Sequence, residues 1–320
     1  MTAVPGVARP SVARPSGSRF SGLGWRRARW GYLFILPWIV GFVAFTAIPM
    51  VATLVFTFTN VNLTQQEPLR FVGLKNYQEL FADPIFWQSF WVTLKYALVA
   101  LPVAVILPFL VALLLTSRHI RGAGAFRSLF FLPYVVPFIA GVLVWGGMLS
   151  ADTGWLNGFL RLIGLPKPPD WLQDPSWINF GLVIMGIWGL GAGMVVYLAG
   201  LRGVPTDLYE AARIDGATAW QTLRNVTIPM ISPVIFYTIV LSVVEVLQYF
   251  LVPLVLKNGT GEPGGSTMFY NLYLYKNFFT FQNMSYGATM AWVMFGFTLF
   301  VTLLLFGSAR KWVFYAGEAR

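Results

Sequence analysis

The sequence predicts an all-α, polytopic membrane protein with six transmembrane helices, and three observations lead to that prediction. The chain has 320 residues, of which 57% are hydrophobic and 11% are charged, and its mean hydropathy is +0.67. Soluble domains carry about 25% charged residues, so this composition suits a surface that faces lipid. Long runs without charged residues recur along the chain, and about 20 apolar residues suffice to cross a bilayer. The basic residues are also distributed unevenly between alternate loops.

The six predicted spans follow from the uncharged runs in chain order. The first run begins after Trp30 and is longer than the roughly 7–15 residues of a signal-peptide core, so we interpret it as a retained anchor. The second run begins beside Lys95, and the fifth is interrupted only by Glu245. The predicted spans are 31–58, 91–115, 128–149, 178–201, 231–256 and 286–307, within a membrane domain at 30–310.

The basic residues predict that both termini are cytoplasmic. The two terminal segments and the loops after the second and fourth spans hold 15 Lys and Arg, whereas the opposite loops hold 6. Cytoplasmic loops carry the excess of Lys and Arg in membrane proteins. The net charge of +10 therefore reflects topology and not nucleic-acid binding. Residues 1–29 are predicted to be a disordered basic tail and 311–320 a short cytoplasmic tail.

The residue inventory excludes several kinds of enzyme. The chain has no Cys, which removes disulfides, thiolate metal ligands and Cys nucleophiles. Its one His, His119, cannot form a site that needs two imidazoles. No G-x-x-x-x-G-K-[ST] motif is present, so the chain lacks a phosphate-binding P-loop. We predict no catalytic residues, no metal site and no cofactor bound by this chain.

The cytoplasmic loop at 203–229 has the clearest local pattern, which predicts two short helices joined by a turn. Pro205 suits the first turn of a helix. Gly216 can adopt the left-handed conformation that ends a helix. Thr218 and Gln221 have the spacing of a capping box, which begins a second helix.

The remaining residues of this loop complete the prediction. Pro229 and Pro233 are expected to stop the second helix and start the next span. Asp215 falls at a helix C-terminus, where the helix dipole disfavours an acid, so it should have another partner. On this local physics alone, a surface-lying amphipathic connector remains an alternative. Small side chains leave room for a second surface to approach at Ala211, Ala212, Gly216 and Ala217.

The loop also resembles a known family. The segments Glu210–Ala212, Asp215–Ala217 and Ile228–Pro229 resemble the EAA loop of the permease subunits of ABC importers, in the carbohydrate-uptake branch that includes maltose, glycerol-phosphate and trehalose systems. The chain is similar to the first of two unlike permease subunits. Further segments that resemble this branch, in the order typical of the family, are Tyr32–Pro37, Phe71–Tyr77 and Phe131–Pro133.

The resemblance implies a fold, a role and a set of partners. The fold would be that of a type I ABC importer permease in the plasma membrane of a prokaryote. The EAA loop would be a coupling helix seated on a cytoplasmic ATPase, with Glu210 meeting a basic group and Gly216 fixing the turn. The implied partners are a sister permease, two ATPase subunits that bind ATP and Mg, and an external solute-binding protein. The residues implied in coupling are Glu210, Ala211, Ala212, Asp215, Gly216, Ala217 and Pro229.

Glu245 marks a candidate substrate pathway, because a charge at the bilayer centre costs about 2.5–3.5 kcal/mol and needs a polar environment. Ser242, Gln248 and Tyr249 lie three or four residues from Glu245, and this spacing predicts that all four share one helix face. Such a stripe suits a sugar, whose hydroxyls bind polar groups and whose C–H surfaces contact aromatic rings. A structural hydrogen-bond cluster is the alternative. Trp188 is a weaker pathway candidate, with a core or lipid-facing position as its alternative.

Two other classes of function compete with the importer subunit. A secondary transporter or channel working alone would be expected to carry several ion-coupling residues in its spans, whereas Glu245 is the one acid there. A membrane-embedded enzyme would need clustered acids, His or Cys, which the spans do not contain. The sequence leaves the identity of the solute open.

Overall fold

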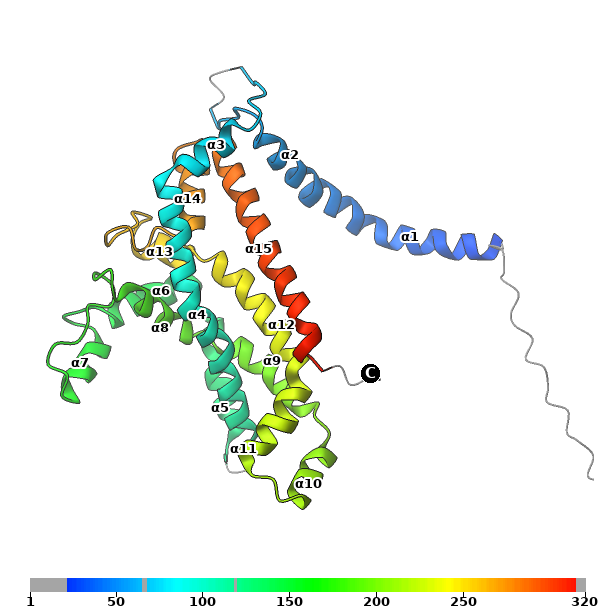
Figure 1. The fold of residues 1–320 in the computed structure, drawn as a ribbon, viewed down its shortest axis with the longest axis vertical. Helices are drawn as coiled ribbons and strands as arrows, with labels where there is room; N and C mark the ends of the chain where they lie inside the picture. Colours follow the sequence, from blue (N-terminus) through cyan, green and yellow to red (C-terminus); the bar gives the residue numbers. More distant parts are fainter. Residues whose placement is uncertain (1–21, 65–67, 118–119, 315–320) are drawn as a thin grey trace, which may run out of the picture. The chain divides into compact units, whose positions relative to one another are not determined.

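The computed structural model describes residues 22–64, 68–117 and 120–314 (Figure 1). Helices and their connections make up these ranges, in which the one extended pairing is an isolated antiparallel bridge between Thr59 and Phe71. The all-α prediction is therefore confirmed. The chain forms two compact units, residues 1–53 and 54–320, and each is described by itself.

The first unit contains the predicted anchor. Helix α1 (Gly22–Phe42), the π-turn η1 (Val43–Ala47) and helix α2 (Ile48–Phe56), whose last residues belong to the second unit, follow one another without a gap. The part from Arg29 onward is long and apolar enough to cross a membrane. Residues 1–21 of the predicted tail lie outside the described residues. The helix starts at Gly22, before the predicted start of the span at residue 31. Arg and Ala are good helix formers, so they extend the helix beyond its apolar part.

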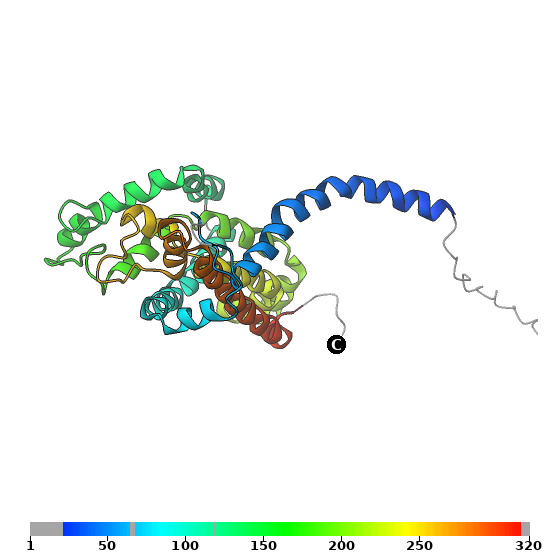
Figure 2. The same cartoon turned by 90° about the horizontal axis from the view of Figure 1, so that it is seen from above.

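The second unit contains three long helical segments, which are seen from the side in Figure 1 and from above in Figure 2. They lie at Pro84–Thr116, Ala219–Leu256 and Met284–Trp312. The first segment is α4 (Pro84–Thr116), the second joins α11 (Ala219–Thr222), η3 (Leu223–Thr227), α12 (Ile228–Leu247) and α13 (Leu251–Leu256), and the third is α15 (Met284–Trp312). The other helices of the unit are α3 (Lys75–Ala82), α5 (Ala123–Phe131), η2 (Leu132–Val135), α6 (Phe138–Met148), α7 (Trp155–Leu162), α8 (Ile178–Ile187), α9 (Gly191–Arg202), α10 (Thr206–Ile214), α14 (Tyr270–Tyr275) and η4 (Lys276–Thr280).

Two of the six predicted spans are bent pairs of helices. The predicted span at 128–149 bends by 102° between the α5–η2 segment and α6, and the one at 178–201 bends by 54° between α8 and α9. Pro133 and Pro137 cause the first bend because proline removes a helical hydrogen bond and clashes with the preceding turn. The described residues therefore hold four long spans, or six if each bent pair counts as one.

The prolines that follow the cytoplasmic loop do not act as predicted. Helices α11 and α12 are joined through the π-turn η3, so the helical segment runs on past Pro229 and Pro233. Pro229 lies at the start of α12, directly after the π-turn η3, and Pro233 lies inside the helix. The expectation that these prolines stop the second short helix is wrong. The break comes instead at Gln248, where α12 ends before α13 begins.

Separate apolar clusters hold the second unit together. One cluster joins α4, α9 and α12 around Met194, Tyr197 and Ile231, at the end of the unit that carries α10. There α9 and α12 approach so closely that a Cβ on Gly200 would lie 2.9 Å from the Val234 side chain. A second cluster joins α4, α14 and α15 around Phe86, at the opposite end of α4. The two clusters fix the ends of α4 against different neighbours.

A polar contact at the start of α4 reinforces the second cluster. Asp83 caps α4 by accepting from the backbone N–H of Ile85 at 2.8 Å, and it also accepts from the hydroxyls of Tyr273, at 2.6 Å, and Tyr286. Burial raises the pKa of the Asp83 carboxyl, but these hydrogen bonds outweigh burial and leave the pKa below its ordinary value. Burial and the bond to Asp83 together raise the pKa of Tyr273 to about 12. The contact therefore joins α4, α14 and α15 through an ionised carboxylate.

Candidate functional site

The loop between α9 and α12 folds into a helical hairpin, here called the α10–α11 hairpin (Thr206–Thr222). Gly216 ends the first arm with a φ of +72°, in the left-handed region as predicted. Thr218 begins the second arm with the predicted capping box: its hydroxyl accepts from the Gln221 N–H at 3.3 Å, and its own N–H donates to the Gln221 side chain at 2.7 Å. The sequence signals for this turn are therefore confirmed by its geometry.

The hairpin presents its predicted coupling residues at the surface. Glu210 and Asp215 are exposed. The expected partner of the Asp215 carboxylate, at the end of α10, is therefore solvent. Ala211 is exposed, Ala212 and Ala217 are half-buried, and the Ala217 N–H donates to the Ala212 carbonyl at 2.9 Å. Pro229 lies apart from them, half-buried in the first turn of α12.

Two large apolar side chains are also exposed on this hairpin, and the sequence analysis gave them no role. Ile214 is 86% exposed and Trp220 is 67% exposed. An exposed apolar pair beside small residues and acids provides a surface that another protein could cover.

A pair of tyrosine–threonine contacts joins this region to α12. The Tyr209 hydroxyl of α10 lies 3.3 Å from the Thr227 hydroxyl, in the π-turn that leads into α12. The Tyr197 hydroxyl of α9 lies 2.6 Å from the Thr238 hydroxyl, and both side chains are buried. Tyr209 also packs against the cluster around Met194. The hairpin, α9 and the half of α12 nearest the hairpin thus pack together as one assembly, which the sequence analysis did not identify.

Most of the predicted pathway residues gather around two adjoining cavities. One cavity, of about 390 Å³, is lined by Ser242, Glu245 and Tyr249. The other, of about 400 Å³, is lined by Trp188 together with the same Glu245 and Tyr249. Because they share lining residues, we call them the Glu245 cavities. They lie between α4, the α5–α6 pair, the α8–α9 pair and α12.

Aromatic residues that the sequence analysis missed complete these cavities. Tyr134 lines both of them, from the η2 bend. Tyr96 of α4 stacks on Tyr249 with ring centroids 4.5 Å apart. Trp145 meets Trp188 edge-on at 6.2 Å. The Glu245 side chain is exposed to this space, so the cavities combine a carboxylate, hydroxyls and aromatic faces. Only the packing of distant elements brings these aromatics together.

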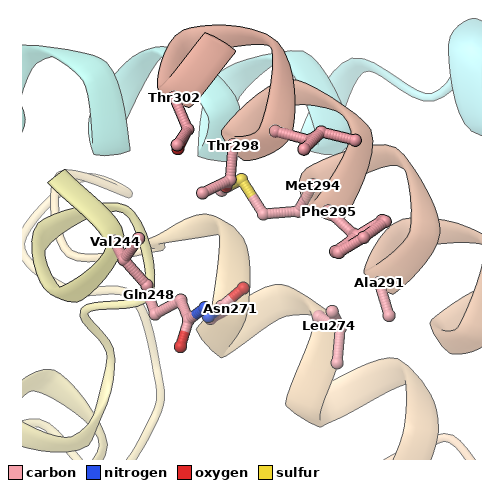
Figure 3. Close-up of a pocket in the computed structure, with 10 residues that line it drawn as sticks. Val244, Gln248, Asn271, Leu274, Ala291, Met294, Phe295, Thr298 and Thr302 are labelled. Atoms are coloured by element: carbon pink, nitrogen blue, oxygen red, sulfur yellow. The ribbon is translucent and has the colours of Figure 1, made fainter. Parts of the chain in front are cut away.

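Gln248 is the exception to the predicted stripe. It lines a third cavity, of about 430 Å³, with Asn271, Thr298 and Thr302 (Figure 3). Helix α12 ends at Leu247, so the regular helical spacing does not continue from Glu245 to Gln248 and Tyr249. The prediction that Gln248 shares a face with Glu245 and Tyr249 is therefore wrong.

Comparisons with known proteins identify the family that has this architecture. Residues 84–313 match the family model described as the inner membrane component of binding-protein-dependent transport systems. The chain is 33% identical over 290 residues to YesP, a probable ABC transporter permease of Bacillus subtilis. The match covers 90% of this chain and 93% of YesP. It is 34% identical over 285 residues to LacF, the lactose transport system permease of Rhizobium radiobacter, covering 88% of this chain and 94% of LacF.

Two further comparisons, one with a sequence relative and one with a solved structure, agree with this family. The chain is 32% identical over 284 residues to MalF, a trehalose/maltose transport system permease of Thermococcus litoralis, covering 88% and 94% of the two chains. Its fold matches, with a TM-score of 0.73 and 23% identity, a chain of a bacterial ABC transporter involved in the import of alginate; the match covers 89% of this chain and 96% of that chain. The type I importer fold that the resemblance implied is thereby confirmed.

Proposed function

Because the chain belongs to the family of binding-protein-dependent transport system inner membrane components, we propose that it is the permease subunit of an ATP-driven importer of a sugar or related solute. The chain is a multi-pass membrane protein, as its family and its apolar helices agree. Beyond membership of this family, we propose the direction of transport, the class of solute and the route by which ATP binding moves the membrane helices.

The chemistry of the Glu245 cavities supports a sugar as the solute. Glu245 and Ser242 offer hydrogen-bonding groups for hydroxyls, while Tyr249 and Trp188 offer ring faces for C–H surfaces. Relatives named for lactose and for trehalose/maltose transport support the same class. The cavities would then form part of a translocation path that a sister permease completes.

The α10–α11 hairpin is proposed as the coupling element. It exposes an acid, Glu210, and an apolar pair, Ile214 and Trp220, at one end of the second unit. A cytoplasmic ATPase subunit would cover this surface, with a basic group at Glu210 and the small side chains of Ala211, Ala212 and Ala217 allowing close approach. Asp215 would remain at the rim, and Gly216 would hold the two arms at their fixed angle.

One observation carries the proposal: the helix that begins at the hairpin also carries the cavity residues. The Tyr209–Thr227 contact joins the hairpin to the π-turn that leads into α12, and Ser242, Glu245 and Tyr249 lie farther along the same segment. When ATP binding closes two ATPase subunits, a hairpin fixed in this way would move α12 as a rigid body and alter the cavities. Pro229, in the first turn of α12, would move with it.

The proposal assigns the remaining chemistry to partners. ATP and Mg would bind to the two ATPase subunits, so this chain would have no enzymatic activity of its own. An external binding protein would deliver the solute, and both termini would lie in the cytoplasm with the hairpin. This arrangement needs four kinds of subunit acting together.

Reconstitution in proteoliposomes tests the function. Vesicles containing this chain, the sister permease, the ATPase and the binding protein are supplied with radiolabelled lactose, trehalose or maltose, with and without ATP on the ATPase side. We expect uptake only with the complete set and ATP. Uptake by this chain alone, independent of ATP, would instead establish a stand-alone secondary transporter or channel.

A further inference from the structure

Helix α7 (Trp155–Leu162), in the connection between α6 and α8, presents an apolar ridge to the outside. Trp155 is 80% exposed, Phe159 is 58% exposed and Leu162 is 86% exposed. Their spacing of four and three residues places them on one helix face. Helix α7 lies at the edge of the second unit in both views (Figures 1 and 2). In water, three large apolar side chains exposed so fully on one short helix would be costly.

The opposite face of α7 is firmly held, so the ridge is presented by a rigid base. Asn157 is 1% exposed, and its amide donates at 3.0 Å to each of the Ala151 and Pro169 carbonyls. The Trp171 indole N–H donates to the Asn157 side-chain oxygen at 2.6 Å. The Arg161 guanidinium donates to the Ala151 carbonyl at 2.9 Å. These contacts close the connection on itself and fix the direction in which Trp155, Phe159 and Leu162 point.

Charge and connectivity indicate what covers the ridge. The cations of the connection, Arg161 and Lys167, lie on or just after α7, whereas its acids, Asp152, Asp170 and Asp174, flank that stretch. The backbone N–H groups of Gln173 and Ser176 donate to Asp170 and Asp174. The charge nearest the ridge is therefore positive, which suits a surface of anionic phosphates. The helices on either side of α7 belong to the two apolar bent pairs, with six residues between α6 and α7 and fifteen between α7 and α8. The start of α7 is therefore tethered close to a membrane-embedded segment. An apolar face with Trp and Phe beside basic residues is the pattern of helices that lie in a membrane interface.

We propose that α7 is an interfacial helix whose ridge of Trp155, Phe159 and Leu162 inserts into the headgroup–acyl boundary of the bilayer, with Arg161 and Lys167 near lipid phosphates. A single eight-residue helix offers much less area than the roughly 800 Å² per partner that a stable protein interface buries. Lipid, by contrast, is present around every membrane-embedded segment of the chain. The role of α7 would be to anchor the connection between the two bent pairs, and it does not depend on the identity of the solute.

The chain is suited to a direct test because it has no native Cys. Trp155→Cys, Phe159→Cys and Leu162→Cys each receive one nitroxide label, with Asp152→Cys, an exposed residue of the same connection, as the control. The full transporter, with Cys-free partner subunits, is reconstituted in vesicles of phosphatidylcholine and phosphatidylglycerol. For each nitroxide label, the frequency of collision with O₂, which concentrates in hydrocarbon, is compared with the frequency of collision with a water-soluble nickel chelate.

We expect all three ridge labels to favour O₂ over the nickel chelate, by about threefold or more relative to the Asp152→Cys label. Labels that meet the nickel chelate as freely as the control would place the ridge in water and overturn the proposal. Labels shielded from both reagents would overturn it in favour of contact with another protein chain. The ridge residues are exposed, so their replacement should leave the yield of folded protein unchanged.

Discussion

At the scale of single residues, hydroxyl and carboxylate contacts join segments that are distant in the chain. The Tyr209–Thr227 contact joins α10 to the π-turn before α12, and the Asp83 contact joins α4 to Tyr273 and Tyr286. The capping box at Thr218 was predictable because its partner is three residues away. The other two contacts were not, because no local pattern relates Asp83 to a tyrosine 190 residues later.

Replacing Tyr209 with Phe should weaken the coupling of ATP hydrolysis to uptake. The change removes one hydroxyl and leaves the ring packed against the cluster around Met194. A neutral hydrogen bond contributes about 0.5–1.5 kcal/mol, so we expect about two- to tenfold less solute transported per ATP hydrolysed. Uptake and ATPase rates are measured together in proteoliposomes. Tyr237→Phe, at a 53% exposed position on α12, is the matched control, and equal ratios in both variants would contradict a coupling role.

The Asp83 contact predicts a pH dependence of stability. Hydrogen bonds leave the pKa of Asp83 below its ordinary value, so the ionised form is favoured in the folded protein. Its contribution is therefore fully present above the unfolded-state pKa of about 3.9 and is lost as the pH falls through the lower, folded-state pKa. We expect the Tm of the detergent-purified wild-type protein to fall as the pH drops below about 4.

The Asp83→Asn variant separates this contribution from the other carboxylates. It keeps the side-chain shape and one acceptor oxygen but removes the titrating group. Its Tm should be lower than that of the wild type at pH 7 and should fall less steeply below about pH 4. Parallel Tm curves for the two proteins would show that Asp83 does not carry the pH dependence.

At the scale of secondary-structure elements, bends and π-turns depart from the straight helices that hydropathy predicts. The α5–α6 and α8–α9 pairs bend by 102° and 54°. Prolines explain the first bend locally, whereas the second depends on a close approach between elements. A Cβ on Gly191 would lie 2.1 Å from the Phe130 carbonyl oxygen, so α9 begins where it can pass directly over the end of α5.

Replacing Gly191 with Ala should therefore separate α9 from α5. Backbone atoms cannot yield as a flexible side chain can, and overpacking of this kind costs about 1–3 kcal/mol or more. We expect a lower Tm and a lower yield of folded protein. Gly147→Ala on α6, where a Cβ would meet nothing within 4 Å, is the control and should be neutral or slightly stabilising. Equal Tm values for the two variants would refute the close approach.

At the scale of the whole molecule, the second arm of the hairpin lies on the same long helical segment as the cavity residues Ser242, Glu245 and Tyr249. The Glu245 cavities collect side chains from α4, η2, α8 and α12, and Gln248 faces a different cavity from Tyr249. The candidate site is thus divided by the packing of helices in a way that spacing along one helix could not specify.

This division predicts different outcomes for neighbouring substitutions. Glu245→Gln keeps the shape of the side chain and removes its charge, and Tyr249→Ala removes a ring from both Glu245 cavities. Loss of a hydrogen bond to a charged group costs about 1.5–3 kcal/mol, so we expect sugar uptake to fall about tenfold or more for Glu245→Gln. Gln248→Ala should leave uptake within about twofold. Wild-type uptake in both Glu245→Gln and Tyr249→Ala would favour a purely structural cluster.

The amino-acid sequence by itself determined the membrane class, the approximate spans, the left-handed turn at Gly216 and the capping box at Thr218. Each of these depends on hydropathy summed over a window or on residues within a few positions of one another. Tertiary packing alone decided the close approach at Gly191 and the separation of Gln248 from Glu245. These depend on which distant backbone or side chain lies opposite each residue, and local propensity carries no information about that.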